Sequence, residues 1–158
     1  MLLSIDPSLT CTGWALFDDE GVVDLGRIST SPKEQLLDRL QCLADGLQAP
    51  LTEVAGGHVV IEVPSGKVGK KLHGRNAAGL SVYGVAVGYV ICTSKQLGHE
   101  PDLITEQQWT GSQPKRVRTA IVTGTCPAYA TWVKKDRGGD IADAIGLGEW
   151  WRRIGRHL

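Results

Sequence analysis

The chain of 158 residues holds 17 lysines and arginines against 17 aspartates and glutamates, so its formal net charge is zero. With 42% apolar residues, it is expected to form one soluble globular domain over residues 1–158, with a substantial core. The longest uncharged, largely apolar stretch, 77–92, is short for a membrane span and contains three glycines, and no signal peptide is indicated.

The charges are distributed unevenly along the chain. Residues 1–62 hold ten acids and three bases, a net charge of −7, whereas residues 63–158 hold seven acids and fourteen bases, a net charge of +7. No Asp or Glu occurs in 63–99 or in 107–135. This asymmetry indicates a surface that faces a polyanion, unless the fold mixes the two halves in space. The four cysteines form no CxxC pair, which favours reduced, buried thiols over disulfides or a zinc site.

Short apolar segments bounded by turn residues predict three strands at the start of the chain and two later ones. The five predicted strands span residues 2–6, 12–18, 22–30, 58–63 and 101–105. The fourth is continuously apolar except for Glu62, which indicates a central position in a sheet.

Helical patterns separate and follow the later strands. The first predicted helix, 31–47, has Ser31 as its N-cap, Pro32 in the first helical position and Glu34 completing a capping box. Its expected apolar face consists of Leu36, Leu40, Leu43 and Leu47, with Leu37 beside them. Three further helices are predicted over 75–97, 114–124 and 138–154.

This order of elements predicts an α/β fold with one mixed five-stranded sheet and helices on both of its faces. The first three strands are expected to be antiparallel, and the helical crossovers make the later strands parallel to the first. The first and fourth strands are then neighbours, so their carboxyl ends lie side by side.

Acidic residues stand at the ends of these two strands and at the start of the last helix. Asp6 ends the first strand and Glu62 lies near the end of the fourth, while Asp140 and Asp143, three residues apart, share one helix face. Taken singly, Asp6 is explained as a turn cap and Glu62 as a partner for Lys67. The two helix aspartates are explained by the helix dipole. An acid in so apolar a strand as the fourth nevertheless needs a partner or a ligand.

Four carboxylates that converge at one edge of a sheet would repel one another without a cation. Hard divalent ions, which prefer oxygen ligands, remove that repulsion. Two such ions about 3.5–4 Å apart can activate a water molecule and stabilise the leaving oxygen in phosphodiester hydrolysis. Together with basic segments that can hold phosphates, these acids indicate a nuclease.

Three segments resemble the motifs of RuvC-type Holliday junction resolvases, which have a ribonuclease H-like fold. "SIDPSLTCTGWALFD" resembles the first motif, an apolar strand, Asp, Pro, a small residue and then Thr-Gly at the start of strand two. "VVIEVPSGK" resembles the second motif, with Glu62 as its glutamate, and "DIADAIGLGEWW" resembles the last, in which two acids precede an apolar helix. The motifs occur in the family's order over nearly the whole chain, and the compact sequence resembles phage-encoded members.

The resemblance implies that Asp6, Glu62, Asp140 and Asp143 are the catalytic, metal-binding residues. It implies two Mg²⁺ ions, which Mn²⁺ can replace, in an endodeoxyribonuclease that resolves four-way DNA junctions by symmetric paired nicks. The implied processes are recombination, repair or phage DNA processing in the cytoplasm of a bacterial or phage-infected cell, with no membrane partner. Family members are homodimers, and the apolar helix 75–97 is the expected interface.

Basic residues near these motifs are the expected DNA contacts. They are Lys67, Lys70, Lys71 and Arg75 after the glutamate motif, and Lys115, Arg116 and Arg118 at the start of a later helix. A solvated loop would explain the first four equally well. The family carries a lysine near its active site in the second region, and Lys115 is the candidate. One departure from the family is the lack of any aromatic residue in 63–82, where members often carry one that wedges into the junction.

Other functions stay open at this point. A YqgF-like RNA-processing nuclease would share the first strand and the closing aspartate motif, and would prefer duplex or RNA over a junction. A non-catalytic junction-binding protein would tolerate loss of the four acids, all of which are present. A phosphate-binding protein of the actin and sugar-kinase type needs two domains, for which 158 residues are too few.

Overall fold

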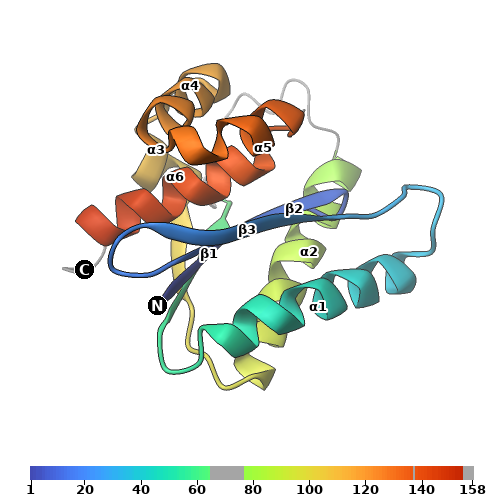
Figure 1. Ribbon diagram of the computed structural model, residues 1–158. Coiled ribbons are helices and arrows are strands. Elements are labelled where there is room, and N and C mark those ends of the chain that lie inside the picture. The colour runs from blue at the N-terminus through green and yellow to red at the C-terminus, as the bar shows by residue number, and fades with distance from the viewer. Residues whose placement is uncertain (65–76, 137, 155–158) are drawn as a thin grey trace.

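The computed structural model describes residues 1–64, 77–136 and 138–154, and all structural statements concern this part of the chain. A five-stranded sheet lies between two layers of helices (Figure 1). In chain order the elements are β1 (Leu2–Asp6), β2 (Cys11–Phe17), β3 (Val22–Ser29), α1 (Leu36–Glu53), β4 (His58–Val63), α2 (Ala77–Gln96), β5 (Asp102–Thr105), α3 (Glu106–Thr110), α4 (Lys115–Thr125), η1 (Pro127–Tyr129), α5 (Ala130–Lys135) and α6 (Asp140–Arg153).

The strand order in the sheet is β3-β2-β1-β4-β5. Strands β1, β2 and β3 are antiparallel neighbours, whereas β4 is parallel to β1 and β5 is parallel to β4. The register of β1 with β4 runs from Leu2 opposite His58 to Ile5 opposite Ile61. The predicted mixed sheet, and the predicted pairing of the first and fourth strands, are therefore confirmed.

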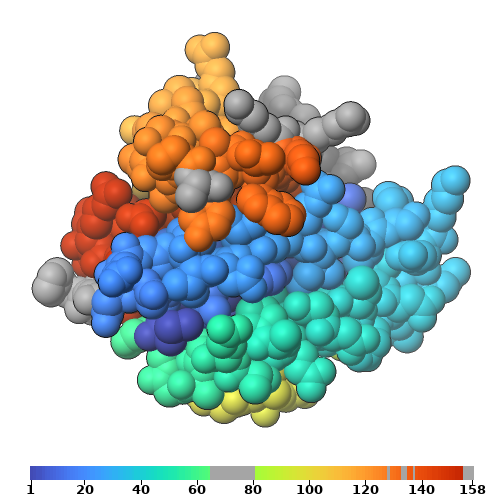
Figure 2. All heavy atoms as spheres, in the orientation of Figure 1, coloured from blue at the N-terminus to red at the C-terminus, as the bar shows by residue number. Residues whose placement is uncertain are grey.

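Alternation along the strands divides the interior into two cores. Leu2 and Val60 belong to the core under α6, whereas Leu3, Ile5 and Ile61 belong to the core under α1 and α2. Helices α3 to α6 lie on one side of the sheet and α1 and α2 on the other (Figure 1), and the space-filling view shows the same order of layers (Figure 2). Helices on both faces are thus confirmed.

The first helix begins later than predicted. It starts at Leu36, with Gln35 in the N-cap position, and continues through Pro50 to Glu53. Ser31 and Glu34 are joined by two hydrogen bonds. The Glu34 carboxylate Oε2 accepts from Ser31 N at 2.9 Å, and the backbone carbonyl of Ser31 accepts from Glu34 N at 3.0 Å. These bonds close a turn and not a helix, so the predicted N-cap is wrong.

Burial explains where the first helix runs. Leu40, Leu43 and Leu47 are buried as predicted, whereas Leu36 and Leu37 are 45% and 77% exposed. The helix extends at its other end because Pro50 and Leu51 are also buried there. Packing against the sheet outweighs the local start signal, so Leu36 and Leu37 do not belong to the core.

Two other expectations need correction. No cysteine is buried: Cys42 and Cys92 are exposed, and Cys11 and Cys126 are partly buried, although all four are free thiols. Helix α3 was not predicted, although Thr105 and Gln108 form its capping box, a signal present in the sequence. Among the described helices, none has the length and apolar character needed to cross a membrane.

Candidate active site

Asp6 and Glu62 lie side by side at the carboxyl ends of the two central strands. Ile5 is opposite Ile61 in the parallel register, so the next residues along each strand, Asp6 and Glu62, are also adjacent. Asp6 lies an even number of residues after Leu2, and Glu62 after Val60, so each shares the strand face of a residue whose side chain packs under α6. Alternation and register therefore direct both carboxylates toward the helix layer that contains α6.

Asp140 and Asp143 lie in the first turn of α6, on the same side of the sheet. Helix α6 approaches the strands closely: the hydroxyl of Ser4 donates to Ala144 O at 2.7 Å. At Gly13 of β2, which is opposite Asp6 in the sheet, a Cβ atom would lie 2.1 Å from Asp140 O. Gly13 thus leaves the space that the start of α6 occupies.

The variant Gly13→Ala tests this close approach. The added methyl group would collide with backbone atoms that cannot rotate away, so α6 must shift at the turn that carries the acids. We expect a loss of roughly 1–3 kcal/mol in the free energy of unfolding, measured by urea denaturation. Gly124→Ala on α4, where a Cβ would meet nothing within 4 Å, is the control and should not destabilise. Equal stability of Gly13→Ala and wild type would contradict this packing.

Burial and the charges of neighbouring acids raise the pKa values of Asp6 and Glu62. Burial raises the pKa of Asp6 well above its usual range, and the negative charges of Glu62 and then Asp143 raise it further. Burial likewise raises the pKa of Glu62 to about 7, against the lowering effect of a hydrogen bond from Trp109. The carboxylates of β1, β4 and α6 therefore lie within electrostatic reach of one another.

Two cationic side chains from α4 contact the α6 acids. The ammonium Nζ of Lys115 lies 2.9 Å from Asp143 Oδ2 and 3.3 Å from Asp140 Oδ1. Arg118 holds Asp143 with two hydrogen bonds, from Nε to Oδ1 at 3.0 Å and from Nη2 to Oδ2 at 3.1 Å. The lysine that the sequence assigned to the active-site region, Lys115, does lie beside two of the four acids.

The expected DNA contacts divide into three groups. Arg118 is only 8% exposed and its guanidinium is bonded to Asp143, which differs from the expected contact with phosphate. Lys115 is partly exposed beside the acids, and Arg116 is exposed on α4. The remaining residues, Lys67, Lys70, Lys71 and Arg75, lie outside the described residues.

Sequence reasoning missed Trp109 of α3. Its indole Nε1 donates to Glu62 Oε2 at 2.7 Å, and its ring lies 5.1 Å from Arg118 Cζ. The capping box of α3 marks the start of this helix, and a tryptophan one turn along it is the sequence signal for this contact.

Sequence reasoning also missed a second group of possible metal ligands, which surrounds Asp140. Ligand atoms of Cys11, Asp136 and Asp140 all lie within 4.8 Å of one another, so these side chains could together hold a metal ion. Asp136 Oδ2 accepts from Ile141 N at 2.6 Å and thereby caps α6. Burial and its hydrogen bond with Asp140 raise the pKa of the Cys11 thiol to about 11, so this group carries a proton at neutral pH.

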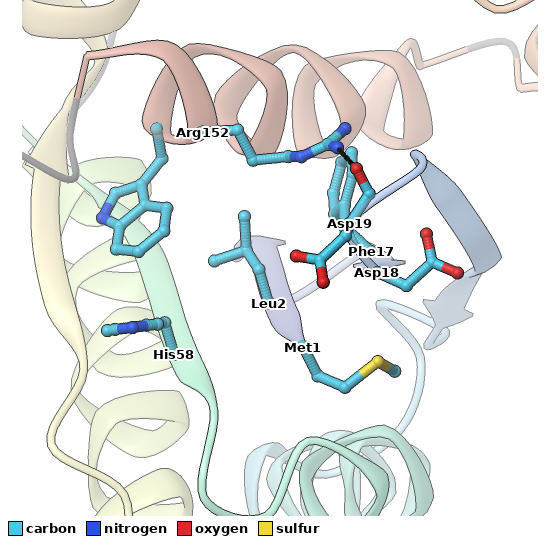
Figure 3. Close-up of a pocket in the computed structure, with 8 residues that line it drawn as sticks. Met1, Leu2, Phe17, Asp18, Asp19, His58 and Arg152 are labelled. Carbon is cyan, nitrogen blue, oxygen red and sulfur yellow. Dashed lines mark hydrogen bonds between the residues drawn. The ribbon is translucent and has the colours of Figure 1, made fainter.

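A pocket at the opposite end of the sheet is not part of this acidic site. It is lined by Leu2 and His58, which begin β1 and β4, and by Asp18, Asp19 and Arg152 (Figure 3). Arg152 Nη2 donates to Asp19 O at 2.7 Å there.

Comparisons with known proteins agree with this geometry. No family model matches the chain. The crossover junction endodeoxyribonuclease RuvC of Sphingopyxis alaskensis is 29% identical over 154 residues, with 93% of each chain covered. The structure of T. thermophilus RuvC in complex with a Holliday junction substrate matches with a TM-score of 0.71 and 18% identity, and the match covers 98% of this chain and 96% of that one.

The chain is thus similar to RuvC proteins in sequence and in fold. A further Thermus thermophilus RuvC structure matches with a TM-score of 0.64 and 17% identity over the same shares of the two chains. The ribonuclease H-like fold that the RuvC motifs implied is thus confirmed by the solved structures. The three elements that carry the motifs, β1, β4 and α6, are those that bring the four acids to one edge of the sheet.

Proposed function

We propose that the chain is a divalent-cation-dependent endodeoxyribonuclease that resolves four-way DNA junctions by paired nicks, in the cytoplasm of a bacterial or phage-infected cell. The observation that carries the proposal is the convergence of carboxylates from β1, β4 and α6. Burial raises the pKa of Asp6, and the charges of Glu62, Asp143 and Asp140 raise it further. Such a set is unfavourable without a cation and well suited to bind one.

The donor set fits a hard divalent ion. Asp6, Glu62, Asp140 and Asp143 would hold two Mg²⁺ ions, or Mn²⁺ in their place, through oxygen atoms alone. When bound, the ions supply the positive charge that activates a water molecule and stabilises the leaving oxygen. The chain itself contributes the ligands and their fixed spacing, because β1 and β4 are rigid central strands.

Basic groups beside the acids would hold the substrate. Lys115 Nζ is partly exposed next to Asp140 and Asp143, so its ammonium can contact a phosphate at the site. Arg116 is exposed on the same helix. We further assign phosphate contacts to the basic segment after β4, with Lys67, Lys70, Lys71 and Arg75.

A homodimer would present two such sites to the two strands that must be cut. Helix α2 buries Ala86, Val87 and Val90 on one face and exposes Val82 and Val85. The glycines Gly84 and Gly88 have nothing within 4 Å of an added Cβ, so close approach of a second α2 is sterically open. A two-fold axis through this face matches the two-fold symmetry of paired nicks.

The pH dependence of cation binding follows from Glu62. Glu62 has a pKa of about 7, so its carboxyl is mostly protonated below pH 7 in the metal-free protein. Because this pKa is raised in the folded state, the metal-free protein loses stability as the pH rises through about 7. Cations bind the ionised form, so Mn²⁺ affinity should rise about tenfold from pH 6 to pH 8. Isothermal titration calorimetry measures this, with Glu100→Gln on the exposed surface as the control. Affinity that is constant over this range would contradict the assignment of Glu62.

The substrate class is tested by cleavage in Mg²⁺. The purified protein is incubated with a synthetic four-way junction, a linear duplex of the same sequence and an RNA–DNA hybrid. We expect symmetric nicks in the junction and little cleavage of the other two. Preferential cleavage of the hybrid would instead identify an RNA-processing nuclease, and junction binding without cleavage would identify a non-catalytic protein.

A further inference from the structure

Two side chains that are not among the four acids connect two of them. Trp109 of α3 contacts Glu62 of β4, Arg118 of α4 contacts Asp143 of α6, and the Trp109 and Arg118 side chains lie against each other. We propose that Trp109 and Arg118 are positioning residues, which hold Glu62 and Asp143 at the orientation that cation binding requires. This inference rests on the proposed nuclease function of the same site.

Trp109 holds one oxygen of Glu62. The indole Nε1–H can only donate, and it donates to Oε2 in a buried bond of 2.7 Å. The other carboxylate oxygen, Oε1, does not take part in this bond. The indole itself has little freedom, because a Cβ on Gly146 of α6 would lie 2.8 Å from Trp109 Cζ3. The ring therefore packs directly on the helix backbone, and it fixes the rotation of the Glu62 carboxylate.

Arg118 fixes Asp143 in a similar way. Its planar guanidinium makes the two parallel bonds that only arginine can make to one carboxylate. The third nitrogen, Nη1, is anchored by Glu106 Oε1 at 3.2 Å and by Gln113 O at 3.1 Å. With these contacts the guanidinium cannot turn without breaking several bonds at once.

The side chains of Trp109 and Arg118 also contact each other. Arg118 Cζ lies 5.1 Å from the centroid of the Trp109 ring, within the range of a cation–π interaction. Glu62 and Asp143 come from elements on different layers, a strand and a helix, and this pair joins them through side chains of α3 and α4. Groups that orient metal ligands in this way typically change metal affinity by about 10–100-fold when they are removed.

The variant Trp109→Phe removes the N–H group and keeps an aromatic ring in the same space. We expect Mn²⁺ affinity of the metal-free protein to fall about tenfold by calorimetry. The Mn²⁺ concentration that gives half-maximal junction cleavage should rise by a similar factor. Arg118→Lys, which loses the two-pronged contact, should weaken binding comparably.

The chain offers a matched control for the tryptophan. Trp151 is also buried, and its Nε1 also donates to a carboxylate, Asp102 Oδ2, at 3.0 Å. This second bond joins α6 to β5 by the pocket at the opposite end of the sheet, where His58 lies against the Trp151 ring. Trp151→Phe should therefore lose stability without changing Mn²⁺ affinity by more than about twofold.

A double-mutant cycle separates positioning from general destabilisation. If Trp109 acts through Glu62, Trp109→Phe should have no further effect on Mn²⁺ affinity once Glu62→Gln is present. The inference is overturned if Trp109→Phe binds Mn²⁺ as the wild type does, if Trp151→Phe weakens binding equally, or if the two changes add. A wild-type protein that binds Mn²⁺ but cuts no junction would overturn the proposed function and leave this inference to be judged by binding.

Discussion

The variant Glu62→Gln is expected to cut four-way junctions about 10³-fold more slowly than the wild type, while it binds them with unchanged affinity. The amide keeps the size of the side chain and an oxygen that can accept from Trp109 Nε1. It removes the negative charge, whose contact with a bound cation would contribute several kcal/mol, and each 1.4 kcal/mol is a factor of ten in rate. Single-turnover cleavage and a Ca²⁺ gel-shift assay measure the two quantities.

Glu100→Gln is the control for this variant. Glu100 is an exposed acid that pairs with Lys95, away from the strand ends, so its loss should leave cleavage unchanged. Wild-type turnover in Glu62→Gln would remove Glu62 from the proposed catalytic residues. Asp143→Asn is a less clean test, because it also disrupts the buried pair with Arg118.

The variant Arg118→Met should lose about 3 kcal/mol in the free energy of unfolding when divalent cations are absent. Removing one partner of a buried ion pair is among the costliest single changes. It leaves the Asp143 carboxylate with Lys115 Nζ at 2.9 Å but without the guanidinium. Asp143 is 3% exposed and already lies near Asp6 and Glu62, so the loss of the guanidinium increases carboxylate repulsion. Mn²⁺ should stabilise this variant less than it stabilises the wild type, because the loss of Arg118 weakens cation binding. Urea denaturation with and without Mn²⁺ measures both effects.

Arg153→Met supplies the comparison at the surface. Arg153 is 67% exposed and pairs with Glu149 at 3.3 Å on α6, so its removal should change stability by less than 1 kcal/mol. Equal stability of the two variants would show that the contact between Arg118 and Asp143 contributes nothing.

The positions of the acids could be predicted because strand periodicity and topology determine where they lie. Side chains alternate between the two faces of a strand, so Asp6 lies on the same face as Leu2, and Glu62 on the same face as Val60. The crossover connection makes β1 and β4 neighbours. Neither inference depends on side-chain packing, so both follow from the order and spacing of residues along the chain.

The contacts around the acids could not be predicted in this way. Arg118 has the sequence context of a DNA-binding residue, since no acid occurs from 107 to 135. Its partners, Glu106 and Asp143, come from α3 and α6, which only the tertiary structure brings to α4. The predicted start of α1 was wrong for a related reason, because burial of Leu40 and the residues after it decides where that helix lies.

Crystals of the chain grown with Mn²⁺ offer the most direct test of the central claim, that the four acids together bind divalent cations. An anomalous difference map identifies the ion without reference to activity. We predict a peak about 2.1 Å from an oxygen of Asp6 and within the same distance of Glu62 or Asp143. A map from a fully loaded crystal with no peak in contact with Asp6 would contradict the account.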